Sequence, residues 1–323
     1  MKAVRANGAG NAFLLVDCTS TKETFTFATP LSAVQIQAMS KEHGTFDQLI
    51  VIFPTVVKAP VEPTADTMEV GIRFWNIDGG EVGACGNGTR TAAAYLFRLH
   101  SRLTRVVLVT GEGRRLEAAK KENNPIVSVE MGPPRLLWCE VPMVIDAAAD
   151  AASGASVPLE ALFGPTPHPL QAKGLMAAGC ASMGNPHLVL VFAKESIASS
   201  DQLMAFAREW GSSLEHSHLF PERVNVGFAV PTNPTALELV VWERGAGITQ
   251  ACGTGACAAA VCCLRLGVVC PAAEGARSEV SVSMPGGELV VRWDLASITS
   301  SVALAGPVEF DSEVLPFSIP ACS

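Results

Sequence analysis

Two segments of the chain carry the same short pattern, and this repeat is the strongest constraint on how the chain folds. Residues 84–96 read ACGNGTRTAAAYL, and residues 251–264 read ACGTGACAAAVCCL. In each, a cysteine precedes a Gly-x-Gly step and an Ala-rich run, which predicts a helix that begins just after the cysteine. One such pattern alone is typical of an ordinary tight turn. Its recurrence at Cys85 and Cys252 indicates a duplicated unit.

The remaining patterns also divide into two similar sets. Short β-type runs predict strands near residues 12–17, 48–53, 69–76, 105–111, 126–132, 187–193, 225–231, 237–244, 279–293 and 301–310. Two further helices are expected near residues 31–41 and 199–212. Together these elements predict an α+β fold with mostly antiparallel sheets. Two prolines within residues 131–136 favour a domain junction there, and the Ala/Ser/Pro-rich stretch 143–173 is expected to be a surface excursion rather than core.

Composition limits the classes of function. The chain has 323 residues, 49% of them hydrophobic, and a net charge of −8, which leaves no basic stripe for nucleic acid. No apolar run approaches the roughly 20 residues of a membrane span, and the first residues lack the apolar block of a signal peptide. We therefore expect a cytoplasmic protein that binds neither nucleic acid nor membrane. A homodimer is left open.

The ten cysteines are expected to stay as free thiols, because a chain of this length needs no disulfides in a reducing compartment. There is no Cys-x-x-Cys pair, and no histidine lies near Cys252 in the sequence, so no metal site is expected. The simplest interpretation of most cysteines is that they are small buried hydrophobic residues or bystanders. This interpretation covers Cys18, Cys139, Cys180, Cys263 and Cys270.

A cysteine at the start of a helix has distinctive chemistry. The first backbone N–H groups of a helix have no intrahelical acceptor and carry about half a positive charge, so they bind anions and favour a thiolate. Two such thiols on opposite sides of one small carboxylate could invert a carbon centre, one removing a proton while the other donates one. The helix starts would stabilise the charge that develops on the carboxylate. Nothing in this chemistry requires pyridoxal phosphate or another cofactor.

Several motifs, in order along nearly the whole chain, resemble diaminopimelate epimerase, a family of cofactor-independent two-cysteine enzymes. They are NGAGNAFLLVD (7–17), FDQLIV (46–51), FWNIDGGEVGACGNGTR (74–90), MGPPR (131–135), MGNPHLVL (183–190), RVNVGFAV (223–230), VWERGAGITQACGTGACAA (241–259), MPGGELVVRW (284–293) and AGPVEF (305–310). The resemblance implies two pseudo-symmetric lobes, each a sheet wrapped around a central helix. It places the lobes at residues 1–132, completed by 302–323, and at 133–301.

The resemblance also implies roles for individual residues. Cys85 and Cys252 would be the two bases on opposite faces of the reacting carbon. Glu243 would meet the substrate ammonium and help to activate a thiol, and His187 would deprotonate the other thiol. The less favoured alternatives are an exposed strand-end carboxylate for Glu243 and a hydrogen-bonded core histidine for His187.

The substrate, a small amino acid, would be held by two further groups of residues. Backbone N–H groups at the helix starts would bind its α-carboxylate, from Gly86, Asn87, Gly253 and Thr254. Asn11, Gln48, Asn76, Asn185, Asn225 and Arg244 match positions that hold the rest of the substrate; a guanidinium suits a second carboxylate because it can bind it bidentately.

The chain departs from the family pattern in three places, one of which, Thr91 where a cysteine is common, should be harmless. Ala12 stands where an acidic residue is usual, so the hydrogen bonds of that turn should differ. The loop before Gln48, residues 41–45, is short and lacks the usual Gly-rich pattern. Two alternatives stay open: a racemase or epimerase of another amino acid, such as histidine or hydroxyproline, and a non-catalytic binding protein or thiol redox sensor.

Overall fold

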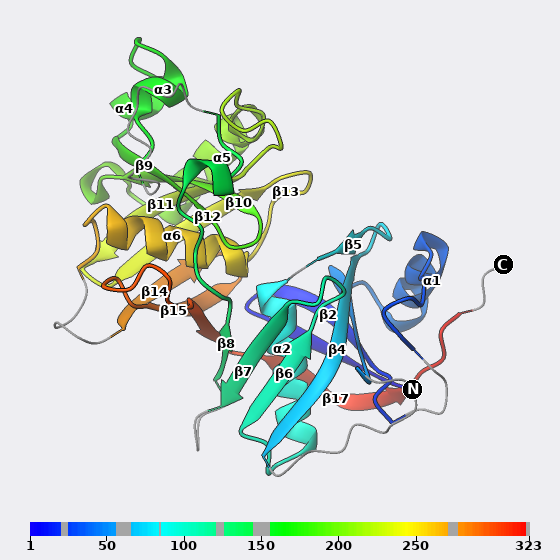
Figure 1. The fold of residues 1–323 in the computed structure, drawn as a ribbon. Helices are drawn as coiled ribbons and strands as arrows, with labels where there is room; N and C mark the ends of the chain where they lie inside the picture. The colour runs from blue at the N-terminus through cyan, green and yellow to red at the C-terminus, as the bar shows by residue number, and fades with distance from the viewer. Residues whose placement is uncertain are drawn as a thin grey trace. The chain divides into compact units, whose positions relative to one another are not determined.

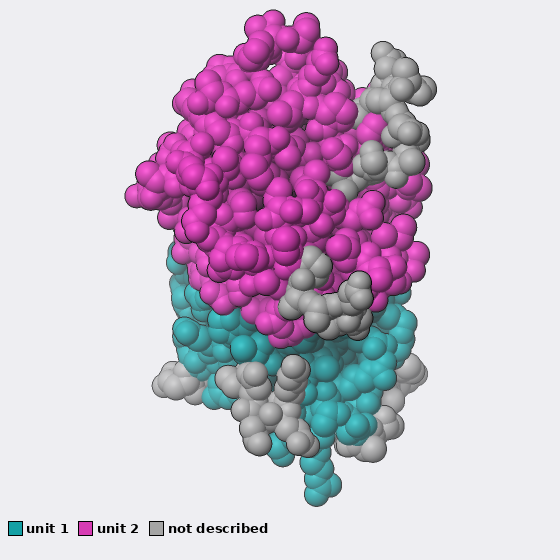
Figure 2. Space-filling view, turned by 90° about the vertical axis from the view of Figure 1, so that its left-hand side faces the viewer, with its two compact units in different colours: residues 1–130, 305–323 teal, residues 131–304 magenta. Residues whose placement is uncertain are grey.

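The computed structural model describes residues 1–20, 25–55, 66–83, 85–120, 126–144, 156–270 and 277–320 (Figure 1). The chain divides into two compact units (Figure 2). Unit 1 comprises residues 1–130 and 305–323, and unit 2 comprises residues 131–304. Within these ranges, no helix has the length and apolar character needed to cross a bilayer. The lobe boundaries expected from the sequence, after residues 132 and 301, stay a prediction.

Unit 1 is built on one mixed sheet. Hydrogen-bonded neighbours follow the order β17, β1, β2, β3, β4, β6, β7 and β8. Their bounds are β17 (Glu309–Pro316), β1 (Lys2–Gly8), β2 (Asn11–Asp17), β3 (Gln48–Phe53), β4 (Thr67–Asn76), β6 (Arg105–Val109), β7 (Arg115–Lys120) and β8 (Val127–Glu130). The two-residue strand β5 (Glu81–Val82) forms a hairpin with the end of β4. The last strand, β17, thus pairs with the first, β1.

Two helices cover the sheet of unit 1. The helix α1 (Ala33–His43) begins at a capping box between Ser32 and Gln35 and buries Ile36 and Met39 against alternate residues of β2 and β3. The helix α2 (Gly86–Leu99) packs against β1, β3, β6, β7 and β8 and is buried from Gly86 to Phe97. A helix buried on all sides lies inside the unit, so the sheet wraps around α2.

Unit 2 repeats this plan. Its sheet runs β9, β10, β11, β12, β14 and β15. The bounds are β9 (Leu175–Ser182), β10 (Pro186–Phe192), β11 (Asn225–Asn233), β12 (Ala236–Glu243), β14 (Ser278–Met284) and β15 (Gly287–Trp293). The short β13 (Gly247–Ile248) forms a hairpin with the end of β12. After β15, the strand β16 (Ala303–Gly306) leads the chain back to unit 1.

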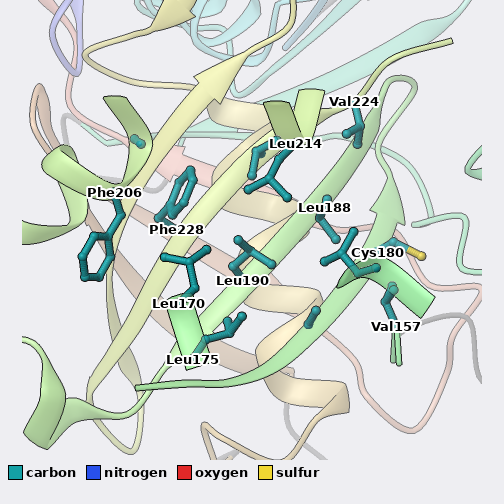
Figure 3. Packing of buried hydrophobic residues seen from close by; sticks show 14 of the residues in the cluster. Val157, Leu170, Leu175, Cys180, Leu188, Leu190, Phe206, Leu214, Val224 and Phe228 are labelled. Carbon is teal, nitrogen blue, oxygen red and sulfur yellow. The ribbon is translucent and has the colours of Figure 1, made fainter. Parts of the chain in front are cut away.

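The helix α6 (Gly253–Arg265) is the counterpart of α2, since it is buried from Gly253 to Leu264 and packs against β9, β10 and β15. The opposite face of the sheet carries a second core, closed by α5 (Ser200–Glu215) (Figure 3). In this core Phe206 and Leu214 of α5 pack among residues of β10 and β11 such as Leu190 and Phe228.

The order of strand pairings shows the duplication. From β1 to β7, successive pairs are antiparallel, parallel, antiparallel, parallel and antiparallel. From β9 to β15 the pairs follow the same order. The expected α+β class is therefore confirmed, as are the four expected helices, now α1, α2, α5 and α6.

Most described residues of the stretch 143–173 are exposed or half-buried, as a surface excursion requires, but Met143, Val157, Leu162 and Leu170 are buried. Short helices α3 (Leu159–Phe163) and α4 (Pro169–Ala172) lie there. They place Leu162 and Leu170 in the core cluster closed by α5, together with Val157. Sparse apolar residues among Ala, Ser and Pro suffice to anchor such a segment, whatever its average composition. Residues 145–155 lie outside the described part.

Candidate active site

Cys85 is the N-cap of α2, with extended backbone at φ −140° and ψ 111°. Its Sγ accepts a hydrogen bond from the Gly88 amide at 3.2 Å. Since Gly86 and Asn87 are the first two residues of the helix, their N–H groups have no acceptor within it. The thiol and these two N–H groups therefore belong to one helix start.

Cys252 occupies the same position in unit 2. It is the N-cap of α6, with φ −135° and ψ 106°, within 5° of the values at Cys85. Cys252 is 6% exposed, and its Sγ lies 3.5 Å from the Thr254 hydroxyl oxygen. Gly253 and Thr254 are here the first residues of the helix.

The second glycine of each motif leaves room for the thiol. A Cβ at Gly88 would lie 3.3 Å from the Sγ of Cys85 and 2.8 Å from the Phe74 ring. A Cβ at Gly255 would lie 3.2 Å from the Sγ of Cys252 and 3.0 Å from Val241. The second glycine of the repeated Cys-Gly-x-Gly is thus explained by the thiol that lies over the first helical turn.

Unit 1 brings four of the predicted polar residues together in pairs. The Asn87 side chain donates to Asn11 Oδ1 at 2.8 Å, and Asn87 itself is 1% exposed. The Gln48 side chain donates to Asn76 Oδ1 at 2.9 Å, across the register pair that joins β3 to β4. Each predicted residue comes from a strand end or from the helix start, where side chains can reach a ligand.

Unit 2 forms a matching set at the start of β10 and β11, where His187 and Asn225 are register partners. His187 Nε2 and Asn185 Oδ1 are 3.1 Å apart. Asn225 donates to the Pro186 carbonyl and accepts from the Arg244 amide, both at 3.0 Å. The exposed Arg244 guanidinium donates to the Glu222 carbonyl at 3.0 Å. Asn225, which is 2% exposed, therefore ties β10 to the hairpin after β12.

Glu243 and Cys252 influence each other directly. The Glu243 carboxylate accepts from the Thr249 hydroxyl at 2.6 Å, and burial raises its pKa, although the hydrogen bonds from Thr249 and Cys252 act in the opposite direction. Burial, reinforced by the negative charge of Glu243, raises the pKa of Cys252 well above its ordinary value.

The expectation that the helix start lowers the thiol pKa is therefore wrong for Cys252. A helix terminus contributes about 0.3–1 kcal/mol, less than the 1.36 kcal/mol that corresponds to one pKa unit. Burial shifts a pKa by up to about 3–5 units. The Thr254 hydroxyl and the Gly255 amide favour the thiolate, but burial and Glu243 outweigh them. Cys252 is accordingly a protonated thiol until its surroundings change.

His187 is 1% exposed. Burial, followed by the positive charge of Arg244, lowers its pKa to about 3. The imidazole is therefore neutral near pH 7 and has one nitrogen that can accept a proton.

Two residues that sequence reasoning missed fix the hairpin of unit 2. Glu215, at the end of α5, accepts from Trp242 Nε1 at 2.8 Å and from the Gly245 amide at 3.0 Å. The Trp242 ring packs on Gly211, where a Cβ would lie 2.4 Å from the ring. Together they hold both sides of the turn that carries Glu243 and Arg244. In the sequence, Glu215 looks like any polar residue of an amphipathic helix.

A different device holds the hairpin of unit 1. The Arg73 guanidinium donates to both carboxylate oxygens of Glu81, at 2.7 and 2.6 Å, and lies over the Trp75 ring at 4.5 Å. This bidentate pair links β4 to β5, directly before Cys85. Nothing in the sequence distinguished it from a surface ion pair.

The departure at Ala12 is compensated locally. The Asp47 carboxylate accepts from the Ala12 amide at 2.8 Å, and the Asp47 amide donates to the Ala12 carbonyl at 2.8 Å. In the short loop before Gln48, Arg5 donates to the His43 carbonyl at 2.7 Å. Gly44, at φ +82°, leaves room for this guanidinium. Side chains of neighbouring elements thus order both altered turns.

The cysteines outside the two motifs divide by burial. Cys18, Cys180 and Cys263 are buried, whereas Cys139 and Cys270 are exposed. Burial raises the pKa of Cys180 and of Cys263 to about 12, which makes them poor nucleophiles. Within the described ranges, no group of three or more His, Cys, Asp or Glu side chains could hold a metal ion.

Comparison with known proteins gives a consistent result across the chain. The model of the diaminopimelate epimerase family matches residues 4–137 and 179–310. The diaminopimelate epimerase of Caulobacter sp. strain K31 is 37% identical over 316 residues, which are 95% of this chain and 94% of that protein. The enzyme of the same name from Neisseria meningitidis is 35% identical over 319 residues, 97% and 98% of the two chains.

Solved structures show the same fold at lower identity. A predicted epimerase from Pseudomonas aeruginosa superposes with a TM-score of 0.58 and 15% identity, over 98% of this chain and 99% of that one. A hydroxyproline epimerase from Agrobacterium vitis, with bound trans-4-hydroxy-L-proline, superposes with a TM-score of 0.56 and 12% identity, over 98% and 91%. At these identities the likeness concerns the fold alone.

Proposed function

The chain belongs to the diaminopimelate epimerase family, and on that premise we propose that it interconverts LL- and meso-diaminopimelate by inverting one α-carbon, without a cofactor. The observation that carries the proposal is the repeated helix start. In each unit a cysteine caps a buried helix with nearly the same backbone angles, beside two N–H groups that have no acceptor within the helix. Two-base inversion needs one thiol for each face of the carbon, and each unit supplies one at a helix start.

In the proposed reaction, the thiolate of one cysteine removes the α-hydrogen as a proton and the thiol of the other donates a proton to the opposite face. The electron pair of the broken C–H bond delocalises into the carboxylate and then forms the new C–H bond. After one turnover the two sulfurs have exchanged protonation states, and exchange with solvent restores them. Backbone N–H groups of Gly86, Asn87, Gly253 and Thr254 stabilise the charge on the carboxylate.

Glu243 and His187 are proposed as the groups that control the protonation states of Cys252 and Cys85. Burial raises the pKa of Cys252 most, and the Glu243 carboxylate raises it further. The raised pKa favours the protonated thiol, which is the proton donor. An ammonium group of the substrate beside Glu243 would neutralise this charge and allow Cys252 to ionise. We assign His187 to Cys85 as its proton acceptor; its pKa is low in this structure, and the negative charge of a thiolate beside the ring would raise it.

The remaining polar residues are proposed to hold the substrate. Amide side chains of Asn11, Gln48, Asn76, Asn185 and Asn225 provide donors and acceptors for ammonium and carboxylate groups. The exposed guanidinium of Arg244 is proposed to bind the distal carboxylate, which a substrate with two amino-acid ends would offer.

Two further proposals concern the cellular compartment and the oligomeric state of the enzyme. We place it in the cytoplasm, because a mechanism with two free thiols needs a reducing compartment. The homodimer also stays a prediction, and light scattering of the purified protein would decide it.

The test is α-proton exchange. In heavy water, each turnover of LL- or meso-diaminopimelate should place one deuterium on the inverted carbon, read by NMR at early times, and the two isomers should interconvert. Single amino acids such as histidine and hydroxyproline serve as matched alternatives. Exchange confined to one of these would replace the proposed substrate, and exchange of none would favour a binding or redox protein.

A further inference from the structure

Arg90, on α2 one turn after the Gly-x-Gly step, is a buried cation that the mechanism above does not use. It is 0% exposed. Helical side chains point back toward the N-terminus of their helix, and one terminal nitrogen of Arg90 donates to Asn87 Oδ1 at 3.1 Å. The other donates to the Pro307 carbonyl. Its Nε has no hydrogen-bond partner in the described structure.

The charge of Arg90 is not balanced by a carboxylate ion pair in the described part of the chain. Burial lowers its pKa to about 10, which leaves it charged near pH 7, and attraction to the Cys85 thiolate opposes that fall. Of the acidic groups on strands that pack against α2, Asp17 bonds Thr19 and Tyr95, and Glu117 pairs with Arg105. Glu130, at the end of β8, does not shift the pKa of Arg90.

Arg90 also fixes the orientation of a neighbouring amide. A guanidinium can only donate, so its bond to Asn87 identifies the accepting atom as Oδ1. The Nδ2 of Asn87 must then face the other way, where it donates to Asn11 Oδ1 at 2.8 Å. A relay thus runs from Arg90 through Asn87 to Asn11, all within unit 1.

We propose that Arg90 is a positioning residue of the N-terminal half of the site: its buried charge favours the thiolate of Cys85, and its N–H group holds the Asn87 amide toward Asn11. The inference deepens the proposed function and rests on its assignment of Cys85 as a base. It adds a residue that acts through Cys85 and Asn87 rather than on the substrate.

The test compares Arg90→Gln, Arg90→Lys and, as a matched control on the same helix, the exposed Arg98→Gln. Iodoacetamide reacts with the thiolate and not with the thiol. The alkylation rate at each pH therefore reports the fraction of Cys85 that is ionised, and mass spectrometry of the Cys85 peptide measures this rate. Arg90→Gln should slow the reaction of Cys85 near pH 7 by about 10- to 100-fold and move its midpoint to higher pH. Cys252 in the same sample should keep its profile, and Arg98→Gln should match the parent.

The lysine variant separates the two roles. A lysine keeps the charge but has no planar fork to span Asn87 and Pro307. Cys85 should therefore react at nearly the parental rate, while KM for the substrate rises and kcat changes less. A Cys85 profile unchanged in folded Arg90→Gln would overturn the charge role. Parental KM in Arg90→Lys would overturn the role in orienting Asn87.

If Arg90→Gln does not fold, as judged by circular dichroism, Arg90→Lys still decides both points. If Cys85 were alkylated in Arg90→Lys as slowly as expected for Arg90→Gln, the proposal that the positive charge at residue 90 favours the Cys85 thiolate would be contradicted. The alkylation experiment needs no turnover, so it tests the role of Arg90 separately from the proposed function. A protein without epimerase activity would contradict the proposed function, whatever effect Arg90 has on the reactivity of Cys85.

Discussion

The amide of Gly88 donates to the Sγ of Cys85 at 3.2 Å, and in unit 2 a Cβ at the corresponding Gly255 would lie 3.2 Å from the Sγ of Cys252. A side chain at the third helical residue would therefore crowd the thiol, together with Phe74 in unit 1 and Val241 in unit 2. The glycine matters here for close approach and not for an unusual backbone angle.

Gly255→Ala tests this packing. Alanine gains about 1 kcal/mol in helix propensity, whereas overpacking against Val241 and Cys252 costs about 1–3 kcal/mol, so the melting temperature should fall only slightly. Displacement of the thiol should lower kcat by about 10- to 100-fold. Gly111→Ala, where the nearest atom to a new Cβ is 3.9 Å away, is the control and should leave kcat unchanged. Equal kcat in both variants would contradict the explanation.

Cys85→Ser and Cys252→Ser test the two-base proposal. A serine hydroxyl is far less acidic than a thiol, so each change should lower the rate of inversion by about 10²–10⁴-fold. The rate is measured by circular dichroism of the product or by deuterium uptake. Cys139→Ser, at an exposed position, should be neutral. Full activity in either motif variant would refute the proposal.

Glu243→Gln removes the negative charge that helps to raise the pKa of Cys252. The reaction of Cys252 with iodoacetamide should begin at lower pH than in the parent, while turnover falls because the substrate ammonium loses its partner. Glu238→Gln, on the same strand β12, is the matched control. If the pH profile of Cys252 alkylation moved to higher pH in Glu243→Gln, the conclusion that Glu243 raises the pKa of Cys252 would be wrong.

His187→Gln should change the pH dependence of stability. The pKa of His187 is about 3 in the folded chain and about 6.5 when unfolded, so between these values the unfolded state binds more protons and stability falls as pH falls. Between pH 7 and pH 5 the parent should lose about 2 kcal/mol from this group. The glutamine variant should lack that part of the loss. Urea titrations at the two pH values, run on both proteins, give the difference.

Glu215→Ala should loosen the hairpin after β12. It leaves the half-buried Trp242 N–H and the Gly245 amide without their acceptor, and the loss of each hydrogen bond costs about 0.5–1.5 kcal/mol. The melting temperature should fall and KM should rise, because Glu243 and Arg244 lose their support. Glu209→Ala on the same helix breaks only an exposed pair with Lys173, worth about 0–1 kcal/mol. Similar effects of both changes would argue against a specific role of Glu215.

Elements with strong local patterns could be predicted from the sequence, and those that depend on distant partners could not. The helices α2 and α6 were predicted from the cysteine, the two glycines and the Ala-rich run of each motif. β1 was missed because KAVRANG contains Lys, Arg, Asn and Gly, yet it is stabilised by pairing with β2 on one side and β17 on the other. β9 was missed because LMAAGCAS is rich in Ala, Gly and Ser, which have low β-propensity.

The same distinction applies to the candidate site. Residues at strand ends and helix starts were proposed from motifs, and the structure adds their hydrogen-bond partners. The raised pKa of Cys252 could not be foreseen, because it depends on burial and on a carboxylate from another strand. Likewise, Glu215 meets Trp242 only after α5 packs on β12.

The pairing of β17 with β1 has a consequence for the order of events on the ribosome. All of unit 2 precedes in the chain the strand that completes unit 1. Because the chain leaves the ribosome from its N-terminus onward, β1 keeps one open edge until β17 has followed unit 2 out of the ribosome. Unit 1 is therefore the first unit to emerge and the last to close its sheet.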